Sequence, residues 1–312
     1  MRRTLVYGTA AALLTVAVVL TLIGWGEESS AFPDWQALIL GLVQGFTELL
    51  PISSSGHLIL VPWAGDWTYL KDHEEFNKTF DVALHLGTLV AVVAYFWNDL
   101  IGYVVACFRS VRRRRVETVD EKIAWIIVVA TIPAALIGAA FESVIEDKLG
   151  EPWQIAILLA VFALVLYWAD RRPERREVGD LSLRQGLLVG LAQSLALAPG
   201  VSRSGITISA GRFLGLTRDA AARLSFLLLV PIVLGAVLLK GYSDVIKGEL
   251  PDGWVGPFVV GTIASAGGGL LAINWLLSYV RGHNYTVFVV YRLALAAIIL
   301  LVIASGIREA GF

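Results

Sequence analysis

Residues 38–57 read LILGLVQGFTELLPISSSGH, and residues 187–206 read LLVGLAQSLALAPGVSRSGI. The two stretches align without gaps at a constant offset of 149 positions, which pairs Gly41 with Gly190, Gln44 with Gln193, Ser53 with Ser202, Ser55 with Ser204 and Gly56 with Gly205. Within this frame Glu48 and His57 belong to the first copy, and Arg203 belongs to the second. Ionisable side chains inside apolar sequence are costly to keep in a membrane, so these three residues mark a candidate functional site.

The composition is that of a membrane protein. Hydrophobic residues make up 57% of the 312 residues, and the mean hydropathy is +0.72, well above the balance of soluble domains. The net charge of -1 says nothing about nucleic acid, but no basic domain is present, and we expect no nucleic-acid partner. Cys107 is the only cysteine, so an intrachain disulfide is excluded.

Seven apolar segments are long enough to cross a bilayer, which needs about 20 residues each. They are 4–24, 80–106, 121–141, 153–169, 219–239, 257–280 and 286–306. The first follows two arginines and has some features of a signal peptide, but it is long for one. We therefore expect an uncleaved additional span within residues 1–30 and a single membrane domain in residues 31–312.

The two repeated stretches are too short to span. Each has an apolar run of only about ten residues, followed by Pro51 or by Pro199-Gly200, and then by a Ser/Gly cluster. Proline ends a helix, and irregular backbone at membrane depth persists only where protein or a water-filled cavity shields it. The sequence therefore predicts two re-entrant helix–loop elements.

The distribution of positive charge predicts the topology. The arginine-rich loops 109–115 and 171–176 should be cytoplasmic, whereas the acidic loops near Glu142–Glu151 and Glu249–Asp252 should lie outside. The two re-entrant elements then enter from opposite sides, as in an inverted-topology repeat. The predicted fold is an all-α, polytopic membrane protein. Its repeats cover about 34–141 and 183–280, and its polar loops meet near the midplane.

The first loop carries groups suited to acid–base or nucleophilic chemistry. Gln44 and Glu48 are four residues apart and share one helix face. After Pro51 come three hydroxyls, a glycine and an imidazole, at Ser53, Ser54, Ser55, Gly56 and His57. A serine and a histidine near a carboxylate can act as an activated nucleophile or as a general acid and base.

The second loop carries groups suited to binding phosphate. The Arg203 guanidinium can hold phosphate oxygens in a bidentate way. Backbone amides at Ser202, Ser204 and Gly205, where a helix is expected to begin, can form an anion-binding nest. A loop that attacks or protonates, facing a loop that holds phosphate, indicates phosphoryl chemistry at membrane depth.

Other polar and aromatic residues receive structural interpretations. His85, inside a predicted span, is expected to be a hydrogen-bonded interior histidine rather than a catalyst. Arg212, Arg218 and Arg223 are expected to face lipid headgroups, although one of them could assist at a phosphate. The tryptophans near predicted interfaces, such as Trp63, are expected to form interfacial belts.

The chain resembles the undecaprenyl-diphosphate phosphatase family, the bacitracin-resistance type of integral membrane phosphatase. The matching residues are 44–57, QGFTELLPISSSGH, and 199–205, PGVSRSG. The resemblance implies hydrolysis of a polyprenyl (undecaprenyl) diphosphate to the monophosphate carrier lipid, for cell-envelope synthesis. It also implies a multi-pass protein of the plasma membrane with inverted repeats, a site open to the outer face, and dependence on a divalent cation, Mg²⁺ or Ca²⁺.

The resemblance assigns roles by position in these motifs. Glu48 resembles the family's essential acid and is the expected metal ligand. Ser54 and His57 resemble its nucleophile or proton-transfer pair, and Arg203, with Ser202, resembles its diphosphate-binding element. The other residues expected at the substrate site are Gln44, Ser53, Ser55, Gly56, Ser204 and Gly205.

Gln44 departs from those family members that have a second glutamate at this position. A neutral amide does not replace a carboxylate as a strong Mg²⁺ ligand, so the metal is expected to be held by Glu48, lipid phosphates and water. The apolar segment 4–24 is a second departure from shorter members.

Several alternatives stay open at this point. Ser54 could attack phosphorus directly, or His57 could activate a water. The same architecture also suits a transporter or flippase of the polyprenyl phosphate, and a non-catalytic scaffold is a further alternative. A phosphatidic-acid-type lipid phosphatase is disfavoured, because its Lys…Arg-Pro and Arg…His…Asp motifs are not found in suitable order. Assembly as a homodimer is also open.

Overall fold

The structure, a computed structural model, describes residues 2–24, 32–240 and 253–311. The acidic loop near Glu249–Asp252, expected outside, lies beyond the described residues. The described chain is built from helices, and its one β-type pairing is an isolated bridge between Arg176 and Leu216. The helices are α1 (Arg2–Leu22), α2 (Asp34–Leu49), α3 (Ser54–Gly65), α4 (Tyr69–Asp72), α5 (Glu74–Tyr95), α6 (Trp97–Arg113), α7 (Val119–Lys148), α8 (Pro152–Asp170), η2 (Val178–Asp180), α9 (Leu183–Ser194), η3 (Leu195–Leu197), α10 (Arg203–Phe213), α11 (Arg218–Lys240), α12 (Val255–Tyr279) and α13 (Thr286–Ala304).

Seven helices of the described chain are long and apolar enough to cross a membrane: α1, α5, α7, α8, α11, α12 and α13. The prediction of one span over 80–106 is wrong, because α5 ends at Tyr95 and α6 begins at Trp97. Phe96 between them leaves the helical conformation, with φ −102° and ψ 19°. Helix α6 is amphipathic, with exposed apolar side chains such as Phe108, as in helices that lie along a membrane surface.

The repeated stretches form two helix–loop–helix units, α2–α3 and α9–α10. In α2 the buried positions Ala37, Leu40, Gly41, Gln44 and Glu48 recur with helical spacing, so an apolar face continues into a polar pair. In both units a serine caps the second helix by accepting a backbone hydrogen bond: Ser53 from Gly56 and Ser202 from Gly205.

Each unit packs against a span distant in sequence through a glycine. Helix α2 packs on α12, and α9 packs on α7. A side chain at Gly41 would collide with the backbone of Gly261 in α12, and one at Gly190 would collide with the backbone of Ala130 in α7. Gly41 and Gly190 are equivalent positions of the two repeated stretches. Small residues let the backbones approach closely, which is how membrane helices associate without a hydrophobic driving force between them.

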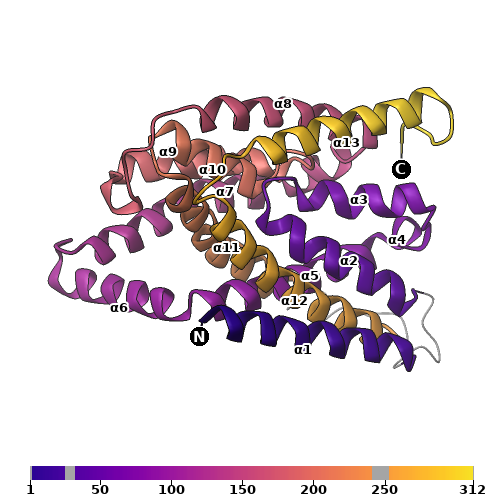
Figure 1. Ribbon diagram of the computed structural model, residues 1–312, viewed down its shortest axis with the longest axis horizontal. Coiled ribbons are helices and arrows are strands. Elements are labelled where there is room, and N and C mark those ends of the chain that lie inside the picture. Colours follow the sequence, from indigo (N-terminus) through magenta and orange to yellow (C-terminus); the bar gives the residue numbers. More distant parts are fainter. Residues whose placement is uncertain (1, 25–31, 241–252, 312) are drawn as a thin grey trace.

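The remaining spans pack against these two units and against one another, with α2 on α5 and α10 on α8 and α11. Helices α8 and α13 run side by side, and α1 lies along α12 (Figure 1). The end of α3 contacts the C-terminal segment, where Trp63 Nε1 donates to the carbonyl of Glu309 (3.2 Å). Trp63 is therefore buried in a helix interface, and its expected place in an interfacial belt is wrong.

Candidate active site

The carboxylate of Glu48 lies in the last turn of α2 and is almost fully buried. Its Oε1 is 3.1 Å from both Nε and Nη2 of Arg203 in α10. Its Oε2 accepts hydrogen bonds from the Ser54 hydroxyl and from Gln44 Nε2 (3.3 Å). Oε1 of the carboxylate thus contacts Arg203, and Oε2 contacts Ser54 and Gln44. The expected meeting of the two loops is observed at this point.

The two loop tips adopt the same unusual backbone conformation. Ser53 has φ 76° and Ser202 has φ 75°, although positive φ is uncommon for residues other than glycine and costs free energy. The tips hold each other in this conformation: Ser53 Oγ accepts from the backbone N–H of Gly200 (3.1 Å), and Ser204 Oγ donates to the carbonyl of Leu50 (2.8 Å). Helices α3 and α10 begin directly after Ser53 and Ser202, so free amides lie next to Glu48 and Arg203.

Arg203 is fixed by its surroundings but keeps binding capacity. Nη1 donates to the carbonyl of Ser225 in α11 (2.7 Å), and the Ser225 hydroxyl in turn accepts from Thr207 (2.8 Å). Nη2 is buried and has no partner in hydrogen-bond geometry, although it lies at ion-pair distance from Glu48. The guanidinium can therefore bind an oxyanion without losing its anchor.

His57 points to a different set of partners. Its Nδ1 lies 2.6 Å from the carbonyl of Ser53, and because a carbonyl only accepts, Nδ1 carries a proton. Its Nε2 lies 2.6 Å from the hydroxyl of Tyr291 in α13, and the two rings stack. Among the described residues His57 makes no hydrogen bond with Ser54, whose hydroxyl donates to Glu48 instead. The geometry thus pairs Ser54 with the carboxylate.

The structure places three further residues beside these loops, of which the sequence interpretation missed Tyr291 and Arg292. His85 is a hydrogen-bonded interior histidine, as expected, with Nδ1 2.7 Å from the carbonyl of Asp81. Its Nε2 nevertheless lies 3.6 Å from Glu48 Oε2, so it faces the carboxylate. Tyr291 and Arg292 come from α13, and Arg292 contacts both loops. An arginine inside the apolar run 286–306 is a signal that the sequence contained.

The donor set for a divalent cation is small. No group of three or more His, Cys, Asp or Glu side chains suited to a metal occurs in the part of the chain that the structure describes. Glu48 supplies one carboxylate, already engaged by Arg203 and Ser54, and Gln44 supplies a buried Oε1 without a hydrogen-bond partner. Mg²⁺ and Ca²⁺ need about six or more oxygen ligands. These residues do not fit a cation alone, and most of its ligands would have to come from elsewhere.

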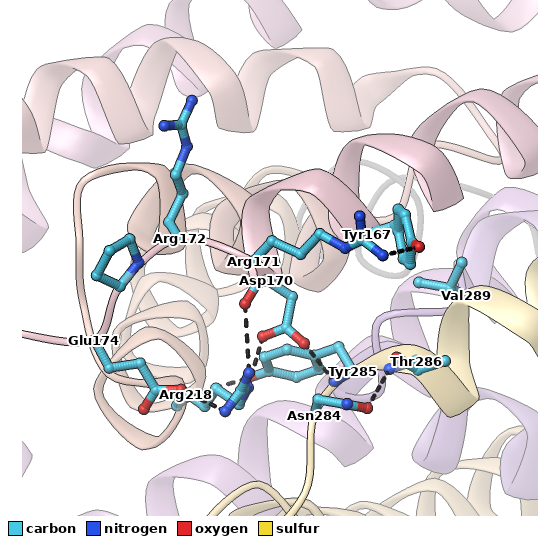
Figure 2. Close-up of a pocket in the computed structure, with 11 residues that line it drawn as sticks. Tyr167, Asp170, Arg171, Arg172, Glu174, Arg218, Asn284, Tyr285, Thr286 and Val289 are labelled. Carbon is cyan, nitrogen blue, oxygen red and sulfur yellow. Dashed lines mark hydrogen bonds and ion pairs between the residues drawn. The ribbon is translucent and has the colours of Figure 1, made fainter.

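A separate polar cavity of about 420 Å³ lies where α8, α11 and α13 meet, and Figure 2 shows its lining. Asp170 accepts from Arg218 Nε (2.6 Å) and from the backbone N–H of Tyr285 (2.9 Å). Burial raises the pKa of the Tyr285 phenol, which keeps its proton and donates to the carbonyl of Arg218 (3.1 Å). Arg218 also pairs with Glu174. The acids are thus balanced by cations, and the network ties helix ends together.

The same network corrects the expectation that Arg212 faces lipid headgroups. The side chain of Arg212 is fully buried and lies within ion-pair distance of Asp170 (3.5 Å) and Glu174 (3.7 Å). Arg218 and Arg223 are partly exposed, but each is paired with an acid, Asp170 and Asp219 respectively. These ion pairs indicate that the three arginines hold the helix ends together.

Comparison with known proteins gives a consistent result. The family model described as bacitracin resistance protein BacA matches residues 37–298. An undecaprenyl-diphosphatase of Moorella thermoacetica is 47% identical over 269 residues, which cover 86% of this chain and 97% of that protein. The undecaprenyl-diphosphatase of Pelotomaculum thermopropionicum is 43% identical over 279 residues, covering 89% and 99%. That of Thermomicrobium roseum is 46% identical, covering 86% and 98%.

Proposed function

We propose a function from one premise, that the chain belongs to the family of the bacitracin resistance protein BacA. The protein is an undecaprenyl-diphosphatase of the membrane, which hydrolyses undecaprenyl diphosphate to the monophosphate carrier lipid and phosphate. One observation carries this proposal for the chain's own residues. The carboxylate of Glu48 contacts a potential nucleophile, Ser54, with one oxygen and a phosphate-binding guanidinium, Arg203, with the other.

The first task of the site is to neutralise the diphosphate. Phosphoryl transfer is catalysed mainly by positioning and by charge stabilisation. Arg203 Nη2 lacks a hydrogen-bond partner, and the N-termini of α3 and α10 present backbone amides at the same junction. Together they form an anion site in which the two phosphoryl groups can be held while the prenyl tail stays in lipid.

The second task is to break the phosphoric anhydride bond. In the covalent route, Ser54 Oγ bonds to the terminal phosphorus, the bond from that phosphorus to the bridging oxygen breaks, and Glu48 takes the hydroxyl proton. The prenyl monophosphate leaves, and water later cleaves the phosphoserine. The hydrogen bond from Ser54 to Glu48 supports this route over activation of a water by His57. His57, held between Ser53 and Tyr291, then positions the loop.

The divalent cation implied by the family enters as part of this proposal. When bound, it neutralises charge on the phosphoryl oxygens. Among the described residues that contact Glu48, only its own carboxylate and the Gln44 amide oxygen could hold the cation, so its other ligands would have to come from the diphosphate and water.

The architecture proposed for the site is an inverted-topology repeat with two re-entrant elements, open to the outer face. Two equivalences at the same offset support it: Gly41 with Gly190 at helix contacts, and Ser53 with Ser202 at strained caps. The packing of α2 on α12 and of α9 on α7 supports it as well. Opposed units of this kind place their loops together near the bilayer midplane.

A phosphate-release assay tests the function. The purified chain in detergent should release inorganic phosphate from undecaprenyl diphosphate, and a chelator should suppress the release. Acid quenching during turnover should trap phosphoserine at Ser54, and Ser54→Ala should yield none. A transporter would release no phosphate. Turnover without any trapped phosphoserine would leave the direct attack of water as the route.

A further inference from the structure

Arg292 is a fully buried arginine in α13 whose guanidinium binds only backbone carbonyls. Nε donates to Leu159 of α8 (3.2 Å), and Nη1 donates to Pro51 (3.3 Å). Nη2 donates to Gly200 (2.9 Å) and to Val201 (3.0 Å). All three nitrogens are therefore used, and the acceptors belong to α8 and to both loops.

The two arms of this guanidinium hold equivalent points of the two loops. Pro51 and Gly200 are related by the same offset of 149 positions that relates the repeated stretches. Pro51 precedes the nucleophile candidate Ser54 by three residues, and Gly200 precedes Arg203 by three residues. The other cross-loop hydrogen bonds are made by the loops' own side chains: Ser53, Ser204, and Arg203 with Glu48. Arg292 is thus an outside support that joins both tips.

The charge of Arg292 has no partner of opposite sign in the described structure. None of the ion pairs found among the described residues involves it, and its acceptors are carbonyl oxygens. A buried cation without a carboxylate is expensive, and the cost is reduced when an anion binds nearby. Arg212 shows the contrast, because it is equally buried but lies between Asp170 and Glu174.

We propose that Arg292 is a positioning residue of the reaction, whose guanidinium fixes the separation between the Glu48–Ser54 pair and Arg203. It acts through the backbones of the two loops and does not touch the substrate. Its unpaired charge also adds positive potential beneath the site where the diphosphate is bound. This inference rests on the proposed function and extends it to α13, which lies outside both loops.

Two variants separate geometry from charge. Arg292→Lys keeps the charge but loses the planar fork, because an ammonium is a point donor on a flexible stem. It should lower kcat at least about tenfold, since small misplacements of reacting groups cost that much or more, and leave KM within about threefold. Arg292→Gln removes the charge as well, and its KM should rise by more than about threefold as uniform binding of the anion is lost.

Arg212→Lys is the matched control, because Arg212 is equally buried and also donates to carbonyls, of Asp170, Arg172 and Leu216. Its kcat per folded molecule should stay within about twofold of the wild-type value. Folding of each variant is followed by thermal unfolding in detergent. Wild-type kcat and KM in folded Arg292→Lys would overturn the inference. So would unfolding of both Arg292 variants while Arg212→Lys folds, because Arg292 would then be a folding residue.

The same experiment distinguishes this inference from the proposed function. If the wild-type chain releases no phosphate, or if Glu48→Gln releases it normally, the proposed function fails. If the wild-type chain is active and Glu48→Gln is not, the proposed function stands, and the Arg292 variants alone decide the inference.

Discussion

Glu48 has more partners than a purely structural carboxylate needs. Arg203, Ser54 and Gln44 contact it, and the His85 imidazole lies 3.6 Å away. A buried charge must be paired and hydrogen-bonded to be tolerated. Here the partners are also the groups that phosphoryl transfer uses: a hydroxyl, a guanidinium and an imidazole. The contacts that stabilise the buried Glu48 carboxylate are therefore the same contacts that the proposed phosphoryl transfer uses.

Three substitutions test the site. Glu48→Gln and Arg203→Ala should each lower turnover by at least about a hundredfold, the usual contribution of positioned acid–base and electrostatic groups. His57→Ala should lower it by a similar factor, because the loop that carries Ser54 loses its contact with Tyr291 and the reacting groups are misplaced. Phosphate release by purified variants measures the effect. Glu117→Gln is the control, because Glu117 is exposed and pairs with Arg113 away from the cluster. Normal rates in all three variants would refute the site.

Gln44→Glu tests the cation proposal. A second carboxylate beside Glu48 should be tolerated and should lower the Mg²⁺ concentration needed for half-maximal phosphate release, because carboxylates are the stronger ligands. Gln193→Glu is the matched control, since Gln193 is the equivalent buried residue and its amide contacts the carbonyl of Ala130. The control should lower the melting temperature without changing the Mg²⁺ requirement. A misfolded Gln44→Glu chain would count against this placement of the side chain.

The contact between Glu48 and Arg203 could be predicted because the two repeated stretches carry an acid in one copy and an arginine in the other, near loop tips that were expected to meet. The partner of His57 could not, because Tyr291 lies in a span whose position no local pattern reveals. Arg292 was recognisable as a charge in an apolar run, but its acceptors depend on how α13 packs on α8. Long-range packing of side chains is therefore the part that sequence patterns left open.

At the scale of elements, the repeated stretches form helix–loop units, their re-entrant placement in the membrane stays a prediction, and one span was misplaced. The apolar composition continues from α5 into α6, so hydropathy alone joined them across Phe96. The contact of α2 with α12 and of α9 with α7 depends on glycines at equivalent positions. Because the neighbouring atoms there are backbone, the helices would have to move apart to admit any side chain.

Gly41→Ala and Gly190→Ala should each destabilise the chain by about 1–3 kcal/mol, the usual cost of overpacking. The melting temperature in detergent reports the loss. Gly102→Ala in α6 is the control, because a side chain there has open space around it, and alanine favours helix over glycine by about 0.5–1 kcal/mol. Equal melting temperatures for all three variants would contradict the described helix contacts.

At the scale of the whole molecule, polar contacts join the helix ends into two separate groups. The ends of α8, α10, α11 and α13 are joined through Asp170, Arg212, Arg218 and Tyr285. The C-terminal segment and the end of α3 are joined elsewhere, where Arg308 pairs with Asp66 (2.5 Å). The proposed topology, which was predicted from the arginine-rich loops, places the first group in the cytoplasm and the second outside.

Cysteine labelling tests that topology, because Cys107 is the only native cysteine. In a Cys107→Ser background, Thr68→Cys, an exposed position after α3, should react with a membrane-impermeant maleimide in intact cells. Arg175→Cys, an exposed position after α8, should react only after the membrane is permeabilised. The reverse pattern would invert the proposed orientation, and equal labelling of both would exclude it.

The reciprocal packing of α2 and α12 has a consequence for biosynthesis. Helix α2 leaves the ribosome early, whereas the surface that covers Gly41 and Gly45 belongs to one of the last spans to be made. Until α12 is made, the glycine face of α2 lacks its final neighbour and must be covered by lipid, by the translocon or by a chaperone. Maturation of the catalytic centre is therefore a late event of translation, and a ribosome stalled before residue 279 would carry a nascent chain that is inserted but inactive.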